Sequence, residues 1–187
     1  PSCGCAVYKI AWREAAGGVK MQGEDPYALE NELYKITFDP ARGGIITSII
    51  LKKEGGRELV RQSDLAFGEM KGYFYDEEAF HSSADAPAAL EKEEGELVSA
   101  MHIAGNIGGH PFSQTVKLRS GDPGIYFHLD IDWQGSPGIG TFRQKDAYNN
   151  SRRSFYDEKG HLNIYFPTSV DGGTLYKNAP FDVCRSV

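Results

Sequence analysis

The stretch that decides the fold runs from Leu29 to Val60 and reads LENELYKITFDPARGGIITSIILKKEGGRELV. Apolar and polar residues alternate from Tyr34 to Asp39, which predicts a half-buried β-strand. The next residues, PARGG, have turn chemistry, because proline presets φ and glycine permits a positive φ. The segment from Ile45 to Leu51 is apolar on both faces apart from two hydroxyl residues, which predicts a central strand. The stretch therefore predicts an antiparallel hairpin, followed by a turn and a short third strand.

The same rhythm continues through most of the chain, and no segment shows a long helical stripe. Turn signals recur at intervals of about 8–12 residues, which is typical of a sandwich. We therefore predict an all-β fold, an antiparallel β-sandwich. Further strands are expected at Glu69–Tyr75, Ala88–Glu93, Leu97–Ala104, Phe112–Arg119, Ile125–Trp133, Leu162–Phe166 and Thr174–Lys177. The polar stretch from Gln134 to Lys159 is the exception, and we expect an extended loop or a loose hairpin there.

Composition narrows the function. The chain has 187 residues, and its 20 basic and 26 acidic side chains give a net charge of −6. This acidic balance argues against nucleic acid and against anionic membranes as partners. No apolar run approaches the roughly 20 residues that a membrane-spanning helix needs. Three cysteines without a common metal-ligand spacing favour ordinary free thiols. The sequence does not indicate a cellular location.

Two later stretches extend the pattern of the first. Residues 109–133 read GHPFSQTVKLRSGDPGIYFHLDIDW, and residues 161–187 read HLNIYFPTSVDGGTLYKNAPFDVCRSV. Together with the LEN, DP, GGI and RELV elements of the opening stretch, they resemble the C-terminal β-domain of family 38 glycoside hydrolases, the retaining α-mannosidases. The resemblance covers residues 3–187, and its middle from Asp76 to Glu96 is weak. It implies a galactose mutarotase-like supersandwich.

The resemblance also implies how the chain is divided. Residues 1–27 are expected to be a strand, Ala6 to Trp12, and a Gly-rich linker that precede the domain. Residues 28–187 are expected to be the β-sandwich domain, truncated at its C-terminal end. The start without methionine fits a strand cut from its natural neighbours, and a natural N-terminus after processing is the alternative.

The chemistry of the parent family does not map onto this chain. Family members hydrolyse α-mannosides with an aspartate nucleophile and a zinc ion held by an N-terminal catalytic domain, and neither motif can be placed here. The five histidines are scattered one per segment, so we predict no catalytic residue and no metal ligand. The expected partners are the catalytic and linker domains of a parent enzyme, which would hold the zinc, and a mannose-containing glycan.

Four residues are carbohydrate-binding candidates by the same resemblance. Tyr73 stands in the segment GYFYD, where relatives place an aromatic residue facing the sugar, and Gly72 would let a backbone approach closely. Asp76 ends the same segment, His81 belongs to the polar segment that follows, and Arg185 resembles an arginine after the family's Pro-Phe close. The plainer interpretation of Tyr73 is a core aromatic of a strand.

Other interpretations stay open at this point. Asp130 and Asp132 share a strand face with His128 at a separation of roughly 6.8 Å, which is compatible with an inverting glycosidase pair. A solvated polar face explains them more simply. The chain could also be a free-standing carbohydrate-binding module, which an exposed row of aromatic residues would favour. A mutarotase enzyme would need a paired His and Glu in an open cleft, and the positions do not supply one.

Overall fold

The computed structural model describes residues 25–140, 161–170, 174, 176–179 and 182–185. The predicted strand from Ala6 to Trp12 and most of the predicted loop from Gln134 to Lys159 lie outside this part of the chain. Within it, regular structure consists of antiparallel strands and three short 3₁₀ turns. The all-β, antiparallel prediction is therefore confirmed.

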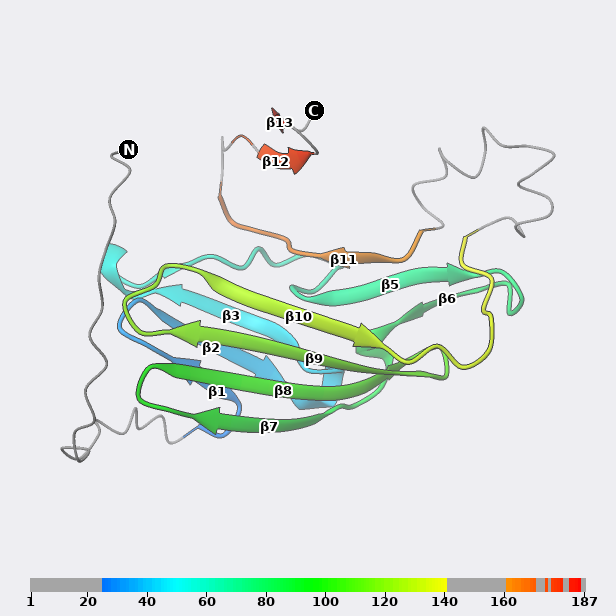
Figure 1. Cartoon of the computed structure of the whole chain (residues 1–187), viewed down its shortest axis with the longest axis horizontal. Coiled ribbons are helices and arrows are strands. Elements are labelled where there is room, and N and C mark those ends of the chain that lie inside the picture. Colours follow the sequence, from blue (N-terminus) through cyan, green and yellow to red (C-terminus); the bar gives the residue numbers. More distant parts are fainter. Residues whose placement is uncertain (1–24, 141–160, 171–173, 175, 180–181, 186–187) are drawn as a thin grey trace.

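Two four-stranded sheets face each other, and a third sheet extends the first (Figure 1). The first sheet contains β1 (Ala28–Glu30), β2 (Tyr34–Asp39), β3 (Ile45–Leu51) and β4 (Arg57–Glu58). The second contains, in spatial order, β10 (Ile125–Ile131), β9 (His110–Arg119), β8 (Val98–Ile107) and β7 (Ala89–Glu94). The third has the order β11 (Asn163–Tyr165), β5 (Glu69–Phe74) and β6 (Ala79–Ser82), and a separate hairpin pairs β12 (Tyr176–Ala179) with β13 (Asp182–Arg185). A backbone bridge from Ile46 to Phe67 joins the first sheet to the segment that leads into the third.

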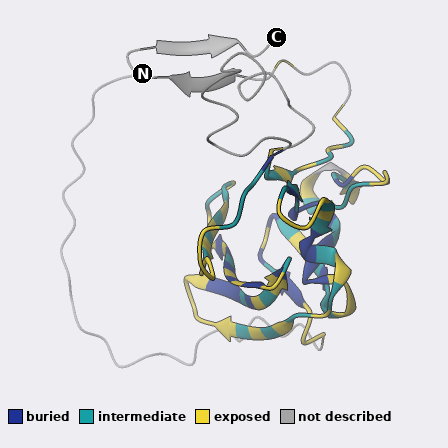
Figure 2. Cartoon of the chain, turned by 90° about the vertical axis from the view of Figure 1, so that its right-hand side faces the viewer, coloured by how far each residue is buried: buried dark blue, intermediate teal, exposed yellow. Residues whose placement is uncertain are grey.

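The core lies between the layers. Alternate residues of each strand point inward, so buried and exposed positions follow one another along the strands (Figure 2). On β9 four alternate residues are all buried, namely Phe112, Gln114, Val116 and Leu118. All three sheets contribute to the cluster, which contains Leu29, Ile36, Phe38, Ile46, Ile49, Val60, Phe67, Met70, Phe74, Met101, Ile103, Ile107, Phe112, Val116 and Leu118.

The LEN element of the opening stretch closes one end of the sandwich. Asn31 is buried, and its Oδ1 accepts hydrogen bonds from the backbone N–H groups of Leu33 (2.9 Å) and Tyr34 (2.7 Å). Its Nδ2 donates to the carbonyl of Arg119 at 3.1 Å, at the end of β9. One side chain therefore shapes the β1–β2 turn and fastens it to the second sheet.

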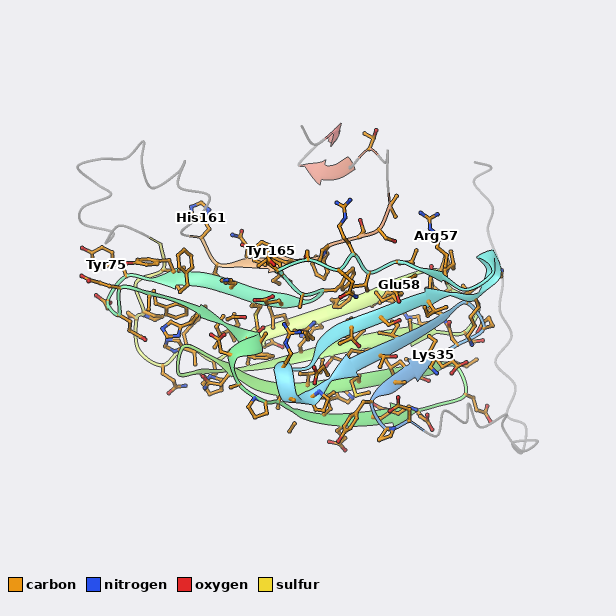
Figure 3. The ribbon with its side chains drawn as sticks, turned by 180° about the vertical axis from the view of Figure 1, so that it is seen from behind. Lys35, Arg57, Glu58, Tyr75, His161 and Tyr165 are labelled. Carbon is orange, nitrogen blue, oxygen red and sulfur yellow. The ribbon has the colours of Figure 1, made fainter. Side chains whose placement is uncertain are left out.

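Glu58 lies on β4, the edge strand of the first sheet at the side away from β1 (Figure 3). Its carboxylate accepts hydrogen bonds from Ser48 Oγ (2.5 Å), Ile49 N (2.9 Å) and Val60 N (2.8 Å). Burial opposes the charged form, but these hydrogen bonds outweigh it and hold the pKa of Glu58 below its usual range. Its carbonyl accepts from Ser169 Oγ at 2.5 Å, which ties the segment after β11 to this edge.

Two details of the second sheet differ from expectation. The strand predicted to end at Trp133 ends at Ile131. The pairing of β10 with β9 stops there, at the pair of Ile131 with Phe112, near the start of β9. Period-two alternation along the predicted strand would place Trp133 on the same face as Phe127 and Ile131, but it lies past the strand with 38% of its surface exposed. Its ring meets the edge of His110 at a centroid distance of 5.1 Å.

Candidate functional site

The predicted site lies on the β5–β6 hairpin. The two strands pair Gly72 with His81 and Tyr73 with Phe80, and the turn between them runs from Tyr75 to Glu78. Glu78 has a φ of 53°, the one positive φ of a non-glycine residue in the described part of the chain. Residues other than glycine rarely adopt this conformation, so the turn is held by its surroundings rather than by its own sequence.

The segment that follows β10 supports the hairpin from its edge. Tyr75 N donates to the carbonyl of Gly138 at 2.7 Å, and Gly140 N donates to the carbonyl of Tyr73 at 2.8 Å. Farther back, Gln134 N donates to Nδ1 of His110 at 3.0 Å. Because this nitrogen accepts a hydrogen bond, the neutral His110 ring carries its proton on Nε2.

A small open pocket of about 210 Å³ lies between the hairpin turn and this segment. The Phe74 ring forms its floor, stacked against His110 at 5.7 Å and meeting His81 edge-on at 4.9 Å. Carboxylates, an amide and a hydroxyl supply the polar lining. The full lining is Phe74, Asp76, Glu77, His110, Gln134, Ser136, Pro137 and Gly138.

His81 does not line the pocket, but it contacts two residues that do, Phe74 and Glu77. Asp76 and Glu77 line the pocket, and Oε2 of Glu77 lies 2.7 Å from Nε2 of His81. The distance permits an ion pair when His81 is protonated. The alignment does not make a hydrogen bond, because Nε2 is buried without an aligned acceptor. At this distance a small rotation of either side chain would align the pair.

Tyr73 lies on the other face of the same hairpin. Its half-buried ring meets the edge of Phe80 at 5.1 Å, and Phe80 is 52% exposed. The plainer interpretation, in which Tyr73 is a core aromatic, therefore does not hold. A Cβ on Gly72 would lie 3.0 Å from the Cα of Leu162, so this glycine does allow a close backbone approach, to the segment that precedes β11. Tyr75 lies at the hairpin end, and Tyr165 lies farther along the same edge of the molecule (Figure 3).

Arg185 is not placed beside the other three candidates. It belongs to β13, where its backbone pairs with Tyr176, and its side chain is outside the described part of the structure. The prediction for Arg185 is therefore untested. Sequence analysis also missed Glu77, His110 and Gln134 as pocket residues. No local signal marks them, since the pocket arises from three segments that meet only in the fold.

The remaining candidates behave as surface residues. Nε2 of His128 pairs with Oδ2 of Asp130 at 2.9 Å, and their side chains are 74% and 69% exposed. Asp132 accepts a hydrogen bond from Gln134 Nε2 at 3.0 Å and is also exposed. The solvated polar face explains them, as the simpler interpretation predicts. Over the described residues, no group of three or more His, Cys, Asp or Glu side chains is arranged to hold a metal ion. The same part of the chain contains no helix long and apolar enough to cross a membrane.

Comparison with known proteins identifies the domain. The family described as glycosyl hydrolases family 38 C-terminal domain matches residues 29–186. A comparison with curated proteins gave no significant match. The matched region begins within β1, at Leu29, and includes all the later strands described above. The chain therefore belongs to the family of glycosyl hydrolase family 38 C-terminal domains.

Proposed function

We propose that this chain is the non-catalytic C-terminal β-domain of an α-mannosidase that hydrolyses terminal α-mannosides in glycans. In this role the domain supports the catalytic domain, and its β5–β6 hairpin forms part of the wall of the sugar-binding cleft. The family match carries the proposal, together with the lack of the family's nucleophile and zinc motifs in this sequence.

The pocket beside the hairpin supports a contribution to a shared wall. Its volume of about 210 Å³ is below the roughly 300–1,000 Å³ of typical small-molecule sites, and it is open. Asp76 and Glu77 are strong hydrogen-bond acceptors that suit sugar hydroxyl groups. A pocket with so few walls offsets little of the entropy of capturing a ligand, so it gains a function only when another domain completes it.

The placement of Tyr73 and Asp76 sets a geometric condition. The two residues lie on opposite faces of one hairpin, so both reach the same ligand only if the hairpin tip projects into the cleft. The open turn from Tyr75 to Glu78 is the part that would enter. In this proposal the zinc ion belongs to the catalytic domain of the parent, as the resemblance to family 38 implies.

A free-standing carbohydrate-binding module is the second candidate. The observation in its favour is the Phe80 ring, which is 52% exposed beside Tyr73 and is available to stack on a sugar. The two candidate functions differ in whether the protein hydrolyses the glycan. A module binds glycan without hydrolysing it, whereas the proposed domain contributes to turnover.

The test is Tyr73→Phe in the intact protein that carries this chain. Removal of one hydroxyl should lower kcat/KM for an aryl α-mannoside about tenfold, the equivalent of one lost hydrogen bond. Asp76→Asn should lower it as well, since a charged acceptor becomes a neutral amide. Steady-state kinetics and a thermal melt would be measured together, and the melting temperature should stay unchanged.

Tyr27→Phe is the matched control, because Tyr27 is exposed and lies in the segment before β1, far along the chain from the hairpin. It should leave kcat/KM unchanged. If Tyr73→Phe and Asp76→Asn both turned over like the unmodified enzyme, the hairpin would be only a packing element and the proposal for it would fail.

A further inference from the structure

The outer face of the second sheet carries a cross-strand trough that the proposed function does not use. Ala89, Ala104 and Ser113 lie side by side on β7, β8 and β9, and all three are exposed. Their small side chains form the floor of a depression of about 520 Å³. Rows of residues on one strand face repeat every two positions, about 6.8 Å apart, so larger side chains in the neighbouring row form a wall beside this floor.

One wall is polar and internally connected. Glu91, His102 and Thr115 form the neighbouring row, and all three line the trough. Nε2 of His102 lies 3.0 Å from Oε2 of Glu93, and Nδ1 lies 3.2 Å from Oγ1 of Thr115. In the neutral ring, Nε2–H donates to the carboxylate and Nδ1 accepts from the hydroxyl, which fixes the imidazole and orients Thr115.

Unused hydrogen-bonding groups face the same space. Among the described residues, neither the Glu91 carboxylate nor the Ser113 hydroxyl has a side-chain hydrogen bond or an ion pair. Thr115 oxygen keeps a lone pair after donating to His102. The trough thus combines a methyl-lined floor with one free carboxylate and two hydroxyls, all held on rigid strands.

This combination selects among classes of ligand. Carboxylates at Glu91, Glu93 and Asp130 disfavour anions. A quaternary or methylated ammonium group would want an aromatic cage, and the trough lining contains no Phe, Tyr or Trp. A pyranose ring matches both surfaces, because its C–H face packs on the alanine methyls and its hydroxyls meet the carboxylate and hydroxyl groups. The volume falls within the range of small-molecule sites.

We propose that the trough over Ala89, Ala104 and Ser113 is a binding site for neutral saccharides, separate from the pocket at the β5–β6 hairpin. The site needs no contribution from a catalytic domain. A test of this site is therefore independent of the function proposed above. An open site of this kind binds weakly, with a Kd of about 1–10 mM. Such a site would hold part of a glycan while another part is elsewhere on the parent protein.

The test is an NMR titration of the 187-residue chain with a neutral mannose trisaccharide. Backbone signals of Ala89, Ala104, Ser113 and Thr115 should move together and saturate at millimolar concentration, while those of the hairpin stay in place. Ala104→Phe fills the floor and should weaken binding at least tenfold. Thr115→Ala, which removes a hydroxyl and frees His102, should weaken it by a smaller factor.

Two matched controls keep the result specific. Val98→Phe places the same ring on the same face of β8 but outside the trough, and Lys117→Ala truncates an exposed residue on the same face of β9. Both should bind as the unmodified chain does. The proposal would be overturned by trough signals that do not move at about 20 mM sugar, by unchanged binding in a folded Ala104→Phe chain, or by tighter binding of a sulfated trisaccharide.

Discussion

Replacing Gly43 with alanine should prevent the chain from folding stably. Gly43 has a φ of 63°, and a Cβ at this position would lie 1.8 Å from the carbonyl oxygen of Ser83. The obstacle is backbone of η3 (Ser83–Asp85), so no side-chain rotation relieves it. The clash and the strained φ together should cost more than about 4 kcal/mol of the free energy of unfolding. This loss is a large fraction of the total stability of a small domain.

Gly55→Ala is the control for this prediction. Gly55 has nearly the same φ, 70°, but a Cβ there would meet nothing within 4 Å. It should therefore cost only the conformational penalty of about 1–2 kcal/mol. Urea unfolding followed by circular dichroism would compare the two variants. Equal stability of both would show that the turn from Asp39 to Gly44 does not pack on η3 as described.

Asn31→Ala should destabilise the domain by about 3 kcal/mol or more. The substitution leaves the N–H groups of Leu33 and Tyr34 and the carbonyl of Arg119 without their partner, at a position where Asn31 is only 2% exposed. Each buried group left unsatisfied costs about 1–3 kcal/mol. Denaturant titration measures the loss as a lower midpoint with an unchanged slope.

Two variants separate the parts of this effect. Asn31→Asp keeps the acceptor for both N–H groups but loses the donor to Arg119, so it should destabilise less than alanine does. Asn106→Ala removes an exposed asparagine whose Oδ1 accepts one turn hydrogen bond, from Gly109 N at 2.8 Å, and should cost about 1 kcal/mol or less. If Asn31→Ala were as mild as Asn106→Ala, the asparagine would not be fastening the two sheets.

The strands were predictable where their signal is local. Alternation placed Tyr34–Asp39 at the bounds that the structure has, and a run that is apolar on both faces did the same for the central strand Ile45–Leu51. β6 (Ala79–Ser82) was missed for a physical reason. Its hairpin turns through Glu78 at positive φ, where glycine or asparagine would have given a signal.

The site was predictable only in part. Tyr73, Asp76 and His81 were assigned to one segment, and that segment is a hairpin. Which residues share a face depends on the register that pairs Gly72 with His81, and this register cannot be read from the sequence without the turn. His110 and Gln134 line the pocket because segments far apart in the sequence meet in the fold. No local sequence pattern predicts such a meeting.

The most direct measurement compares zinc-dependent release of mannose from an aryl α-mannoside by the 187-residue chain and by the intact protein that carries it. The chain supplies a β-domain of family 38 without the family's nucleophile and zinc motifs, so we expect no turnover by the chain alone. We expect turnover by the intact protein, which a chelator should abolish and added zinc should restore. Hydrolysis by the purified chain, or an intact protein that leaves α-mannosides untouched with zinc present, would contradict the proposed function.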